Sequence, residues 1–438
     1  MRVPAALARA RDALPAPLLE VLGRLGQAGH RSWIVGGAVR DLLLHRPRAA
    51  VDFDLATPAT PQQVMALFRK VVPTGVEHGT VTVVTGGLAI EVTTFRGEGR
   101  YLDGRRPESV TFLTDLEADL GRRDFTMNAL AWDPLAGDFR DPHGGRADMA
   151  RRVVRAVGDA AERFAEDGLR PMRAVRFAAQ LGYGLAPSTR QAIPGALPVV
   201  ARVAVERLSD ELGRLVVAHD APRAIGLMRS TGLLEVVLPA LAALPRSVQD
   251  HAARVLGAVP SDPALRFAAL LHPLGADAVG ALLLALRQPR RVADEAAALV
   301  RGHACRLGAR GPVLPPSLPE VRRWLSRSGP DRAEALVALA EAEASASAPR
   351  SRRAARLEVK ELQERLSQIQ RDAPPLSAQD LALDGRAAME ALGTGPGPHV
   401  GEALRHLLER VLEDPSLNQR AALEAELRRW WADRARQP

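Results

Sequence analysis

The chain has 438 residues, a formal net charge of +8 and a single cysteine, Cys305. One cysteine excludes a disulfide framework and cysteine-based zinc sites, and it fits a reducing cytoplasm. Hydrophobic residues make up 47% of the chain and charged residues 25%, which is typical of a globular protein with two to four domains.

Arginine supplies nearly all of the positive charge, because Lys70 and Lys360 are the only lysines. Arginine stays charged and binds phosphate through a planar fork, so the surplus favours nucleic acid as a partner. A compositional bias toward Arg and Ala explains it equally well. We expect no membrane partner, since the N-terminus lacks a signal-peptide core. The most apolar window, residues 265–289, is interrupted by Pro273 and predicts two buried helices joined by a turn.

The first elements of the chain surround a pair of glycines. Leucines at helical spacing predict a helix over residues 15–30. Residues 32–35 predict a short strand that ends at Gly36 and Gly37, and residues 38–44 predict a helix. Such a turn lets backbone N–H groups and a helix N-terminus approach a phosphate closely. A plain tight turn is the alternative.

Two aspartates follow this helix. Residues 51–56 alternate in character and predict a strand, which would place Asp52 and Asp54 on one face and direct Phe53 into the core. Two carboxylates that close repel each other and stay ionised if a divalent cation, best Mg²⁺, lies between them. Glu91 could supply a third carboxylate if its strand lies beside the first. A solvated acidic pair is the alternative, since the chain holds 51 acidic residues.

The rest of the first 150 residues mixes helices and strands, and the remainder of the chain is helical in pattern. Thr60 and Pro61 are typical of a helix start, and Gly86-Gly87 predicts a hairpin between two strands. The other expected elements are a helix over 60–71, the hairpin strands within 79–95, a polar segment over 96–107, a strand over 109–113, a helix or extended turn over 125–133, and a low-complexity hinge over 341–356.

The glycine turn and the aspartates together suggest nucleotidyl transfer. Arg40 lies one turn into the helix after the glycines and could contact a phosphate. Neither lysine follows a glycine-rich run, which excludes a P-loop kinase or ATPase. In nucleotidyl transfer, two metal ions polarise the α-phosphate and lower the pKa of the attacking hydroxyl.

Several motifs occur in a specific order: "VGGAVRDLLLHRP…VDFDLAT", "GTVTV", "IEVTTFR", "DLGRRDFTMNALAWD", "DPHGGRADM", "EDGLRPMRAVRFAAQLGY" and "VERLSDELGRL". The chain thereby resembles the class II tRNA nucleotidyltransferases, which comprise the CCA-adding enzymes and their bacterial poly(A) polymerase relatives. The resemblance is dense over residues 15–215 and weaker beyond. It implies an α+β fold, with a polymerase-β-type nucleotidyltransferase head domain (1–150) followed by an all-helical neck (151–215), body (216–340) and tail (341–438).

The resemblance also implies a function. It predicts template-independent addition of C, C and A to tRNA 3′ ends from CTP and ATP, with two Mg²⁺ ions, in the cytoplasm and without a DNA partner. Three alternatives stay open: an A-adding enzyme that works with a CC-adding partner, a poly(A) polymerase, and a non-catalytic RNA-binding protein on a decayed polymerase scaffold. A full-length segment over 96–107 implies competence for adding the terminal A. Residues 349–356 and 425–436 are candidate tRNA-binding arginine segments.

Specific roles follow for the site residues. The resemblance implies that Asp52 and Asp54 bind metal, that Glu91 joins them in catalysis, that Arg123 and Asp124 contact the ribose, and that Arg173 and Arg176 reach the triphosphate. The full set of implied nucleotide-binding residues is Gly36, Gly37, Arg40, Arg123, Asp124, Asn128, Asp167, Arg170, Arg173 and Arg176.

Asp167 and Arg170 are the residues expected to select the base. If both lie on one helix, their spacing of three places them on one face. A carboxylate accepts and a guanidinium donates, which matches the amino group and ring nitrogen shared by cytosine and adenine. An ordinary exposed salt bridge is the alternative. Gly168 and Pro171 depart from the helix formers more common in relatives, so we expect Pro171 within the first turn of this helix.

One histidine of the body is expected to be a core residue. Pro273 follows His272, where relatives with an HD phosphohydrolase domain carry aspartate. Because His272 has no carboxylate beside it in sequence, we expect no second metal site there.

Overall fold

The computed structural model describes residues 3–46, 53–98, 110–303 and 314–435. The chain divides into two compact units, Met1–Ala243 and Leu244–Pro438. The finer division at residues 150, 215 and 340 stays a prediction. Among the described helices, none is both long and apolar enough to cross a membrane.

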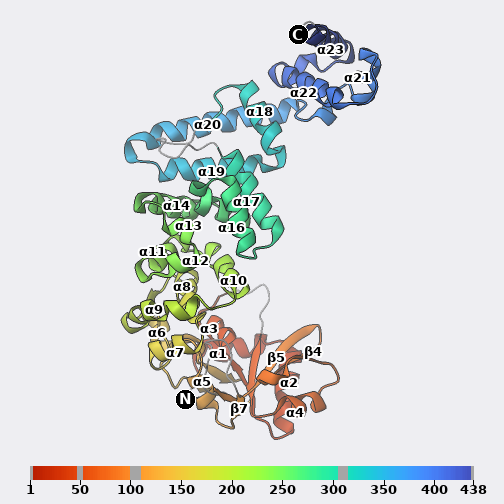
Figure 1. Cartoon of the computed structure of the whole chain (residues 1–438). Helices are drawn as coiled ribbons and strands as arrows, with labels where there is room; N and C mark the ends of the chain where they lie inside the picture. The colour runs from red at the N-terminus through yellow and green to blue at the C-terminus, as the bar shows by residue number, and fades with distance from the viewer. Residues whose placement is uncertain (1–2, 47–52, 99–109, 304–313, 436–438) are drawn as a thin grey trace. The chain divides into compact units, whose positions relative to one another are not determined.

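A mixed seven-stranded sheet forms the N-terminal part of the first unit (Figure 1). Its strand order is β3-β4-β5-β2-β1-β8-β9; β2 and β5 are parallel, and the other neighbours are antiparallel. The strands are β1 (Trp33–Val35), β2 (Asp54–Thr57), β3 (Val71–Gly75), β4 (Thr80–Thr85), β5 (Leu88–Thr94), β8 (Ala131–Asp133) and β9 (Asp138–Arg140). A separate ribbon pairs β6 (Arg96–Glu98) with β7 (Val110–Phe112).

The predicted hairpin and helix start of this region are confirmed. β4 and β5 are joined at Gly86 and Gly87, whose φ angles of 53° and 78° favour glycine. The Thr60 side chain accepts a hydrogen bond from the backbone N–H of Gln63, and Gln63 bonds back to Thr60, so a capping box begins the next helix. The segment 125–133 forms a single 3₁₀ turn, η3 (Thr126–Asn128), and then β8.

The glycine turn and the strand after it occur where the sequence predicts them. β1 is fully buried and ends at Val35; Gly36 has a φ of 70° and precedes the next helix. The strand expected over 51–56 is observed in the described part of the chain as β2, Asp54–Thr57, which begins and ends later than expected. Asp52 lies outside the described residues. Side chains from β1, β8 and α5 (Leu116–Gly121), among them Trp33, Ala131 and Leu120, form one apolar core.

Helices make up most of the rest of the first unit. The region expected to be wholly helical also contains the short parallel pair β10 (Val153–Val154) and β11 (Gly184–Leu185), so that expectation is corrected. The helices are α1 (Ala5–Ala10), α2 (Ala16–Gln27), α3 (Gly37–Leu43), α4 (Pro61–Leu67), α5 (Leu116–Gly121), α6 (Gly145–Ala150), α7 (Ala160–Glu166), α8 (Arg170–Leu181), α9 (Pro187–Val200), α10 (Val205–Val216), α11 (Ala221–Thr231), α12 (Leu233–Val237) and α13 (Pro239–Ala242).

The second unit is helical throughout its described residues. The apolar window over 265–289 forms α15 and α16 with a turn between them, as predicted. A helix break falls inside the segment 341–356, where α19 ends and α20 begins, and the two helices pack against each other. The elements are α14 (Arg246–Ala258), α15 (Pro263–Leu271), η4 (His272–Leu274), α16 (Ala276–Ala285), α17 (Arg290–Gly302), α18 (Leu318–Ser328), α19 (Ala333–Ala346), α20 (Pro349–Asp372), α21 (Gly385–Leu392), α22 (Pro398–Glu413) and α23 (Arg420–Ala435).

Candidate active site

A cavity of about 780 Å³ in the first unit, here named the head cavity, lies between the glycine turn, the strands β2, β4 and β5, and the helices α8 and α10. It brings together most of the residues predicted to bind nucleotide or metal. Those lining it are Gly36, Gly37, Arg40, Asp54, Glu91, Arg123, Asp124, Asn128, Arg173 and Arg176.

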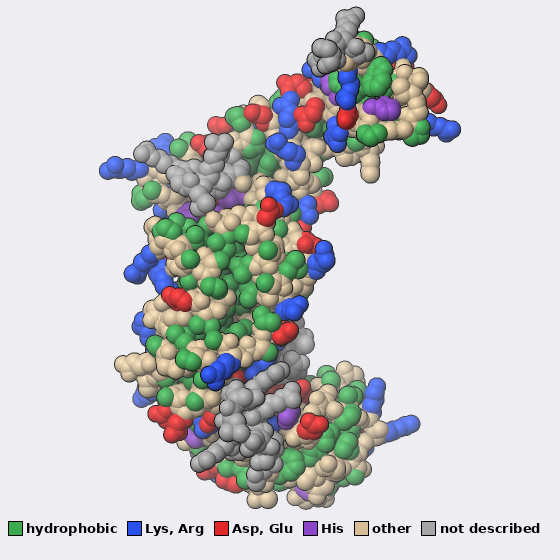
Figure 2. All heavy atoms as spheres, viewed as in Figure 1, with side chains coloured by type: hydrophobic (Ala, Val, Ile, Leu, Met, Phe, Trp, Pro, Cys, Tyr) green, Lys and Arg blue, Asp and Glu red, His purple; other side chains and the backbone are tan. Residues whose placement is uncertain are grey.

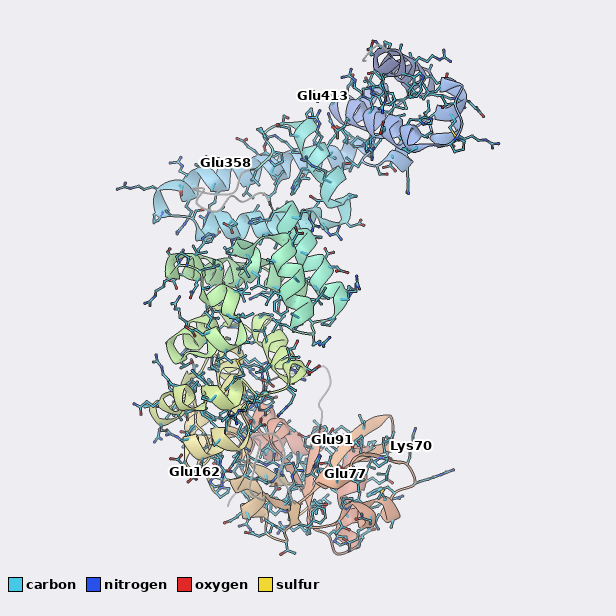
Figure 3. The ribbon with its side chains drawn as sticks, in the orientation of Figure 1. Lys70, Glu77, Glu91, Glu162, Glu358 and Glu413 are labelled. Atoms are coloured by element: carbon cyan, nitrogen blue, oxygen red, sulfur yellow. The ribbon has the colours of Figure 1, made fainter. Side chains whose placement is uncertain are left out.

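Two carboxylates reach this cavity from neighbouring strands. Asp54 and Glu91 are register partners in the parallel pair β2–β5, so the expected adjacency of the two strands is confirmed. Glu91 is labelled in Figure 3. In paired parallel strands, partners in register project to the same face of the sheet. Both side chains line the head cavity, and carboxylate oxygens are the ligands that Mg²⁺ prefers.

The glycine turn lies against a guanidinium. A Cβ on Gly36 would lie 3.0 Å from Nη1 of Arg123 and 4.0 Å from Oδ2 of Asp54. Nε of Arg123 is buried and finds no hydrogen-bond partner among the described residues. A buried guanidinium donor without a partner, at the wall of a cavity, fits an anionic ligand there.

We expect Gly36→Ala to lower kcat/KM for nucleotide addition by about 10²-fold, because displacing Arg123 or Asp54 by a fraction of an ångström misplaces the reacting groups. The φ of 70° and ψ of −135° at Gly36 also cost a side chain about 1–3 kcal/mol. Gly87→Ala is the matched control, because it combines a φ of 78° with open space around its Cβ. Gly87→Ala should lower the free energy of unfolding and leave kcat/KM unchanged. Equal losses of kcat/KM in both variants would contradict an effect of the new Cβ on Arg123 and Asp54.

A hydrogen-bonded network links the helix after the glycine turn to the segment 124–128. Nη1 of Arg40 donates to Oδ1 of Asn128 at 2.7 Å, and Nδ2 of Asn128 donates to Oδ1 of Asp124 at 2.9 Å. Arg40 also makes a two-pronged contact with Asp41, at 2.8 and 3.1 Å. All four side chains are buried, so the network holds Arg40 and Asn128 in fixed positions at the cavity wall.

Asp124 ties this network to α8. Nε and Nη2 of Arg173 donate to Oδ2 of Asp124 at 2.9 and 2.6 Å. Burial alone would raise the pKa of Asp124, but the Arg173 charge and the Asn128 hydrogen bond outweigh it and hold the pKa below its usual value. Asp124 is therefore ionised at neutral pH, and it positions Arg173 along the cavity.

The outer wall of the head cavity contains groups that sequence reasoning missed. Arg214 and Phe177 both line it, and the guanidinium of Arg176 lies 4.0 Å from the Phe177 ring centroid. Those of Arg40 and Arg173 lie 5.0 and 5.5 Å from the same ring. Arg173 and Phe177 are four residues apart on α8, a spacing that was visible in the sequence.

Glu211 of α10 neutralises part of this positive charge. It bonds to Nε of Arg176, and its Oε1 lies 3.6 Å from Nη1 of Arg173. The Arg176 and Glu211 side chains are each 5% exposed. Arg173 therefore pairs with Asp124 and Glu211, and Arg176 pairs with Glu211, which faces α8 from α10.

Arg123 is held from behind by a buried aspartate. Asp119 accepts from Arg122 at 2.8 and 2.9 Å and from Nη2 of Arg123 at 3.4 Å. Burial alone would raise the pKa of Asp119, but the charges of Arg122 and Arg123 outweigh it and lower the pKa. The ionised form of Asp119 therefore stabilises the fold and orients Arg123.

We expect Asp119→Asn to cost about 2 kcal/mol of unfolding free energy at pH 7, the scale of a buried hydrogen bond to a charged group. Because the pKa of Asp119 is lower in the folded protein than its unfolded value of about 3.9, its contribution is complete above about pH 4 and is lost as the pH falls through the folded pKa. Urea unfolding should therefore show the two proteins converging below pH 4. Exposed Glu117→Gln, on the same helix, should change little; a gap independent of pH would contradict this account.

Asp167 and Arg170 are placed differently from the other predicted residues. Asp167 lies in the turn after α7, and α8 begins at Arg170, so the expectation that they share a helix face is wrong. The break arises at Gly168, where a Cβ would lie 2.7 Å from the backbone oxygen of Val199. Pro171 lies in the first turn of α8, as predicted.

Both of these side chains contact protein groups. Oδ2 of Asp167 accepts from Arg207 at 2.8 Å. Arg170 donates to the backbone oxygen of Arg122 at 3.0 Å and pairs with Glu166. Among the described residues that line the head cavity, neither Asp167 nor Arg170 is present.

The charges of the head cavity suit a polyphosphate. Its described lining carries the guanidiniums of Arg40, Arg123, Arg173, Arg176 and Arg214 and three acidic side chains. Guanidiniums bind phosphate oxygens in pairs, and the carboxylates of Asp54 and Glu91 suit a hard cation. A cation held by these carboxylates beside a triphosphate on this arginine wall is what nucleotidyl transfer requires, so the fold and the site define a nucleotidyltransferase.

Comparisons with known proteins define the family. Residues 32–155 match the model of the poly A polymerase head domain, and residues 182–244 match the model described as a probable RNA and SrmB- binding site of polymerase A. The CCA-adding enzyme of Geobacillus stearothermophilus is 39% identical over 427 residues, covering 96% of this chain and 98% of that protein. The CCA-adding enzyme of Anoxybacillus flavithermus is 49% identical over 224 residues, 51% of this chain and 55% of that protein.

The comparison with solved structures leads to the same family. The crystal structure of the Bacillus stearothermophilus CCA-adding enzyme in complex with CTP matches with a TM-score of 0.77 and 36% identity, covering 96% of this chain and 98% of that one. A tRNA nucleotidyltransferase complexed with a primer tRNA and an incoming ATP analog shares the fold, with a TM-score of 0.54 at 24% identity, over 78% of this chain and 98% of that one. The chain belongs to the family of CCA-adding enzymes.

Proposed function

We propose that this chain adds C, C and A in turn to tRNA 3′ ends, taking the nucleotides from CTP and ATP, releasing pyrophosphate and using no nucleic-acid template. The observation that carries the proposal is the head cavity, in which Asp54, Glu91 and five arginines converge, in a chain that aligns over 96% of its length with a CCA-adding enzyme.

Asp54 and Glu91 are the residues of the head cavity that we propose to bind Mg²⁺. Their strands are in register, and both side chains line the cavity. We propose that they hold Mg²⁺ together with Asp52, which lies outside the described residues; two ions are expected. When bound, Mg²⁺ polarises the α-phosphate and lowers the pKa of the attacking 3′-hydroxyl.

The arginine wall is proposed to bind the triphosphate. Arg123 offers a buried Nε donor beside the glycine turn, and Arg173 and Arg176 extend along α8. Gly36 and Gly37 let the backbone approach a phosphate without a side chain between them. Asp124 is proposed to accept from the ribose hydroxyl while Arg173 and Asn128 keep it ionised.

Base selection by Asp167 and Arg170 stays part of the proposal. Asp167 accepts and Arg170 donates, which suits cytosine and adenine and rejects guanine and uracil. Because Asp167 contacts Arg207 and Arg170 contacts Glu166, reading a base requires that these contacts be exchanged for the incoming nucleotide.

The RNA is proposed to be held by arginines outside the head cavity. In the view of Figure 2, Lys and Arg side chains are distributed over both units and do not gather in one patch. Phosphate contacts of this kind weaken steeply with salt. The segments 349–356 and 425–436 remain the candidates, and the cytoplasmic location remains a prediction.

One assay separates the alternatives for the product. The enzyme is given tRNA transcripts that lack CCA, CA or A, with labelled CTP and ATP and Mg²⁺. We expect all three transcripts to be completed and extension to stop at CCA. Addition only to the transcript ending in CC identifies an A-adding enzyme, continued A addition identifies a poly(A) polymerase, and no incorporation identifies a non-catalytic RNA-binding protein. The segment 96–107, from which A addition was predicted, lies largely outside the described residues, so this assay is its test.

A further inference from the structure

Three histidines and a glutamate meet inside the second unit. His251 lies on α14, His272 begins η4, His303 follows α17, and Glu343 lies on α19; these four residues are named the histidine cluster. The expectation that His272 has no carboxylate partner is therefore wrong, because Glu343 reaches it from a helix about seventy residues further along the chain.

The imidazole nitrogens converge on one carboxylate. Nε2 of His251 lies 2.9 Å from Oε2 of Glu343, and Nε2 of His272 and of His303 lie 3.1 and 3.4 Å from Oε1. The rings are close to one another as well: the centroids of His251 and His272 are 5.6 Å apart, and those of His272 and His303 are 5.4 Å apart. The three side chains of His272, His303 and Glu343 are each at most 5% exposed.

Hydrogen bonds among the described residues do not satisfy every ring nitrogen of this cluster. Nδ1 of His272 lies 2.9 Å from the backbone oxygen of Ala269, and a carbonyl only accepts, so Nδ1 carries the proton. In the neutral ring, Nε2 of His272 then presents a lone pair toward the carboxylate. Nε2 of His303 is buried and finds no hydrogen-bond partner among the described residues. A proton shared with the Glu343 carboxylate can satisfy only one ring nitrogen, whereas a metal ion can bind several ligand atoms at once.

One ring nitrogen each of His251 and His272 and a carboxylate oxygen of Glu343 all lie within 4.8 Å of one another, close enough to share a metal ion. With bonds of about 2.0–2.1 Å, neighbouring ligand atoms around a tetrahedral Zn²⁺ lie about 3.3 Å apart, and the nitrogens of His251 and His272 lie 2.9 and 3.1 Å from Glu343 oxygens. A histidine that binds a metal usually donates its other ring N–H to a carbonyl or carboxylate, and Nδ1 of His272 donates in this way to the backbone oxygen of Ala269.

We propose that the histidine cluster is a transition-metal site, with His251, His272 and Glu343 as ligands of a Zn²⁺-type ion and His303 packed against the Glu343 carboxylate. Neutral imidazoles and one carboxylate select Zn²⁺ and its neighbours over Mg²⁺, which prefers oxygen. The metal joins α14, η4 and α19, so its role is to hold these helices of the second unit together. His251 is 27% exposed and provides the entry path; histidine side chains are visible at the surface near α14 and α19 in Figure 2.

The test is a Co²⁺ titration of the full-length protein after EDTA treatment and desalting. We expect one equivalent of Co²⁺ to give the visible absorption bands of a four-coordinate site, Zn²⁺ to displace it, and either metal to raise the midpoint of thermal unfolding. Glu343→Gln should weaken Co²⁺ binding by at least about tenfold. Glu341→Gln, on the same helix with an exposed side chain, should bind as the unchanged protein does.

Two further variants test whether the Co²⁺ site is the histidine cluster or the head cavity. His251→Gln removes the ligand whose side chain is 27% exposed. It tests the same site if Glu343→Gln does not fold. Asp54→Asn removes a proposed ligand of the head cavity and should leave the Co²⁺ spectrum intact. The inference is overturned if the unchanged protein gives no such spectrum, if Glu343→Gln and His251→Gln both keep it, or if Asp54→Asn abolishes it.

Discussion

We expect Asp54→Ala to reduce the addition of C and of A by at least about 10³-fold, because removing a carboxylate that holds the catalytic cation removes charge stabilisation from the transition state. Asp54 is the first residue of β2 and only half-buried, so the fold should survive. The measurement is the rate of label incorporation into a tRNA transcript at saturating CTP or ATP, together with the thermal unfolding midpoint.

Two other acidic residues of the same domain provide a control and a second test. Glu77, an exposed residue of the same domain that lies outside the described lining of the head cavity, is replaced by alanine and should leave the rate unchanged (Figure 3). Glu91→Gln tests the third carboxylate: a wild-type rate removes Glu91 from the proposed site. Near-normal incorporation by a folded Asp54→Ala protein refutes the metal assignment as a whole.

Glu211→Ala is expected to destabilise the first unit by about 3–5 kcal/mol, since it leaves the Arg176 guanidinium buried without its counter-ion. The Arg176 side chain is 5% exposed, and its other side-chain contacts among the described residues are the Gln180 oxygen, at 2.6 Å, and the Phe177 ring. Neither contact carries a negative charge. The loss should appear in calorimetry as an earlier first unfolding transition, and kcat/KM should fall because Arg173 and Arg176 lose their common anchor.

The cause can be isolated within the same helix pair. Glu211→Leu combined with Arg176→Met removes both charges, and this double variant should recover most of the lost stability, because an apolar pair of similar volume replaces the ion pair at little cost. Its kcat/KM should stay low, since Arg176 is proposed to bind the triphosphate. Asp210→Ala, exposed on the same helix, should shift stability by less than about 0.5 kcal/mol. A double variant as unstable as Glu211→Ala would contradict the charge argument.

Much of the candidate site was predictable because its signals are local. Gly36 and Gly37 mark a turn through their lack of a side chain, and Thr60-Pro61 marks a helix start through its own hydrogen bonds and fixed φ. The ordered motifs fixed the family, and ten of the predicted residues line one cavity. Asp167 and Arg170 were misplaced on one helix, because the close approach of Val199 to Gly168 is not visible in the local pattern.

The sequence by itself determined the strands and the glycine turn of the head, because a spacing of two residues on a strand, or of three to four on a helix, decides which side chains share a face. Its arginine content and its ordered motifs also determined the chemistry of the site and the family. Only the tertiary structure decided which distant groups meet. Glu91 enters the site through a parallel register with Asp54, and Glu211 crosses from α10 to Arg176. Glu343 lies 92 residues from His251, yet contacts it. Such contacts depend on packing between elements, where burial makes an unpaired charge costly and so selects its partner.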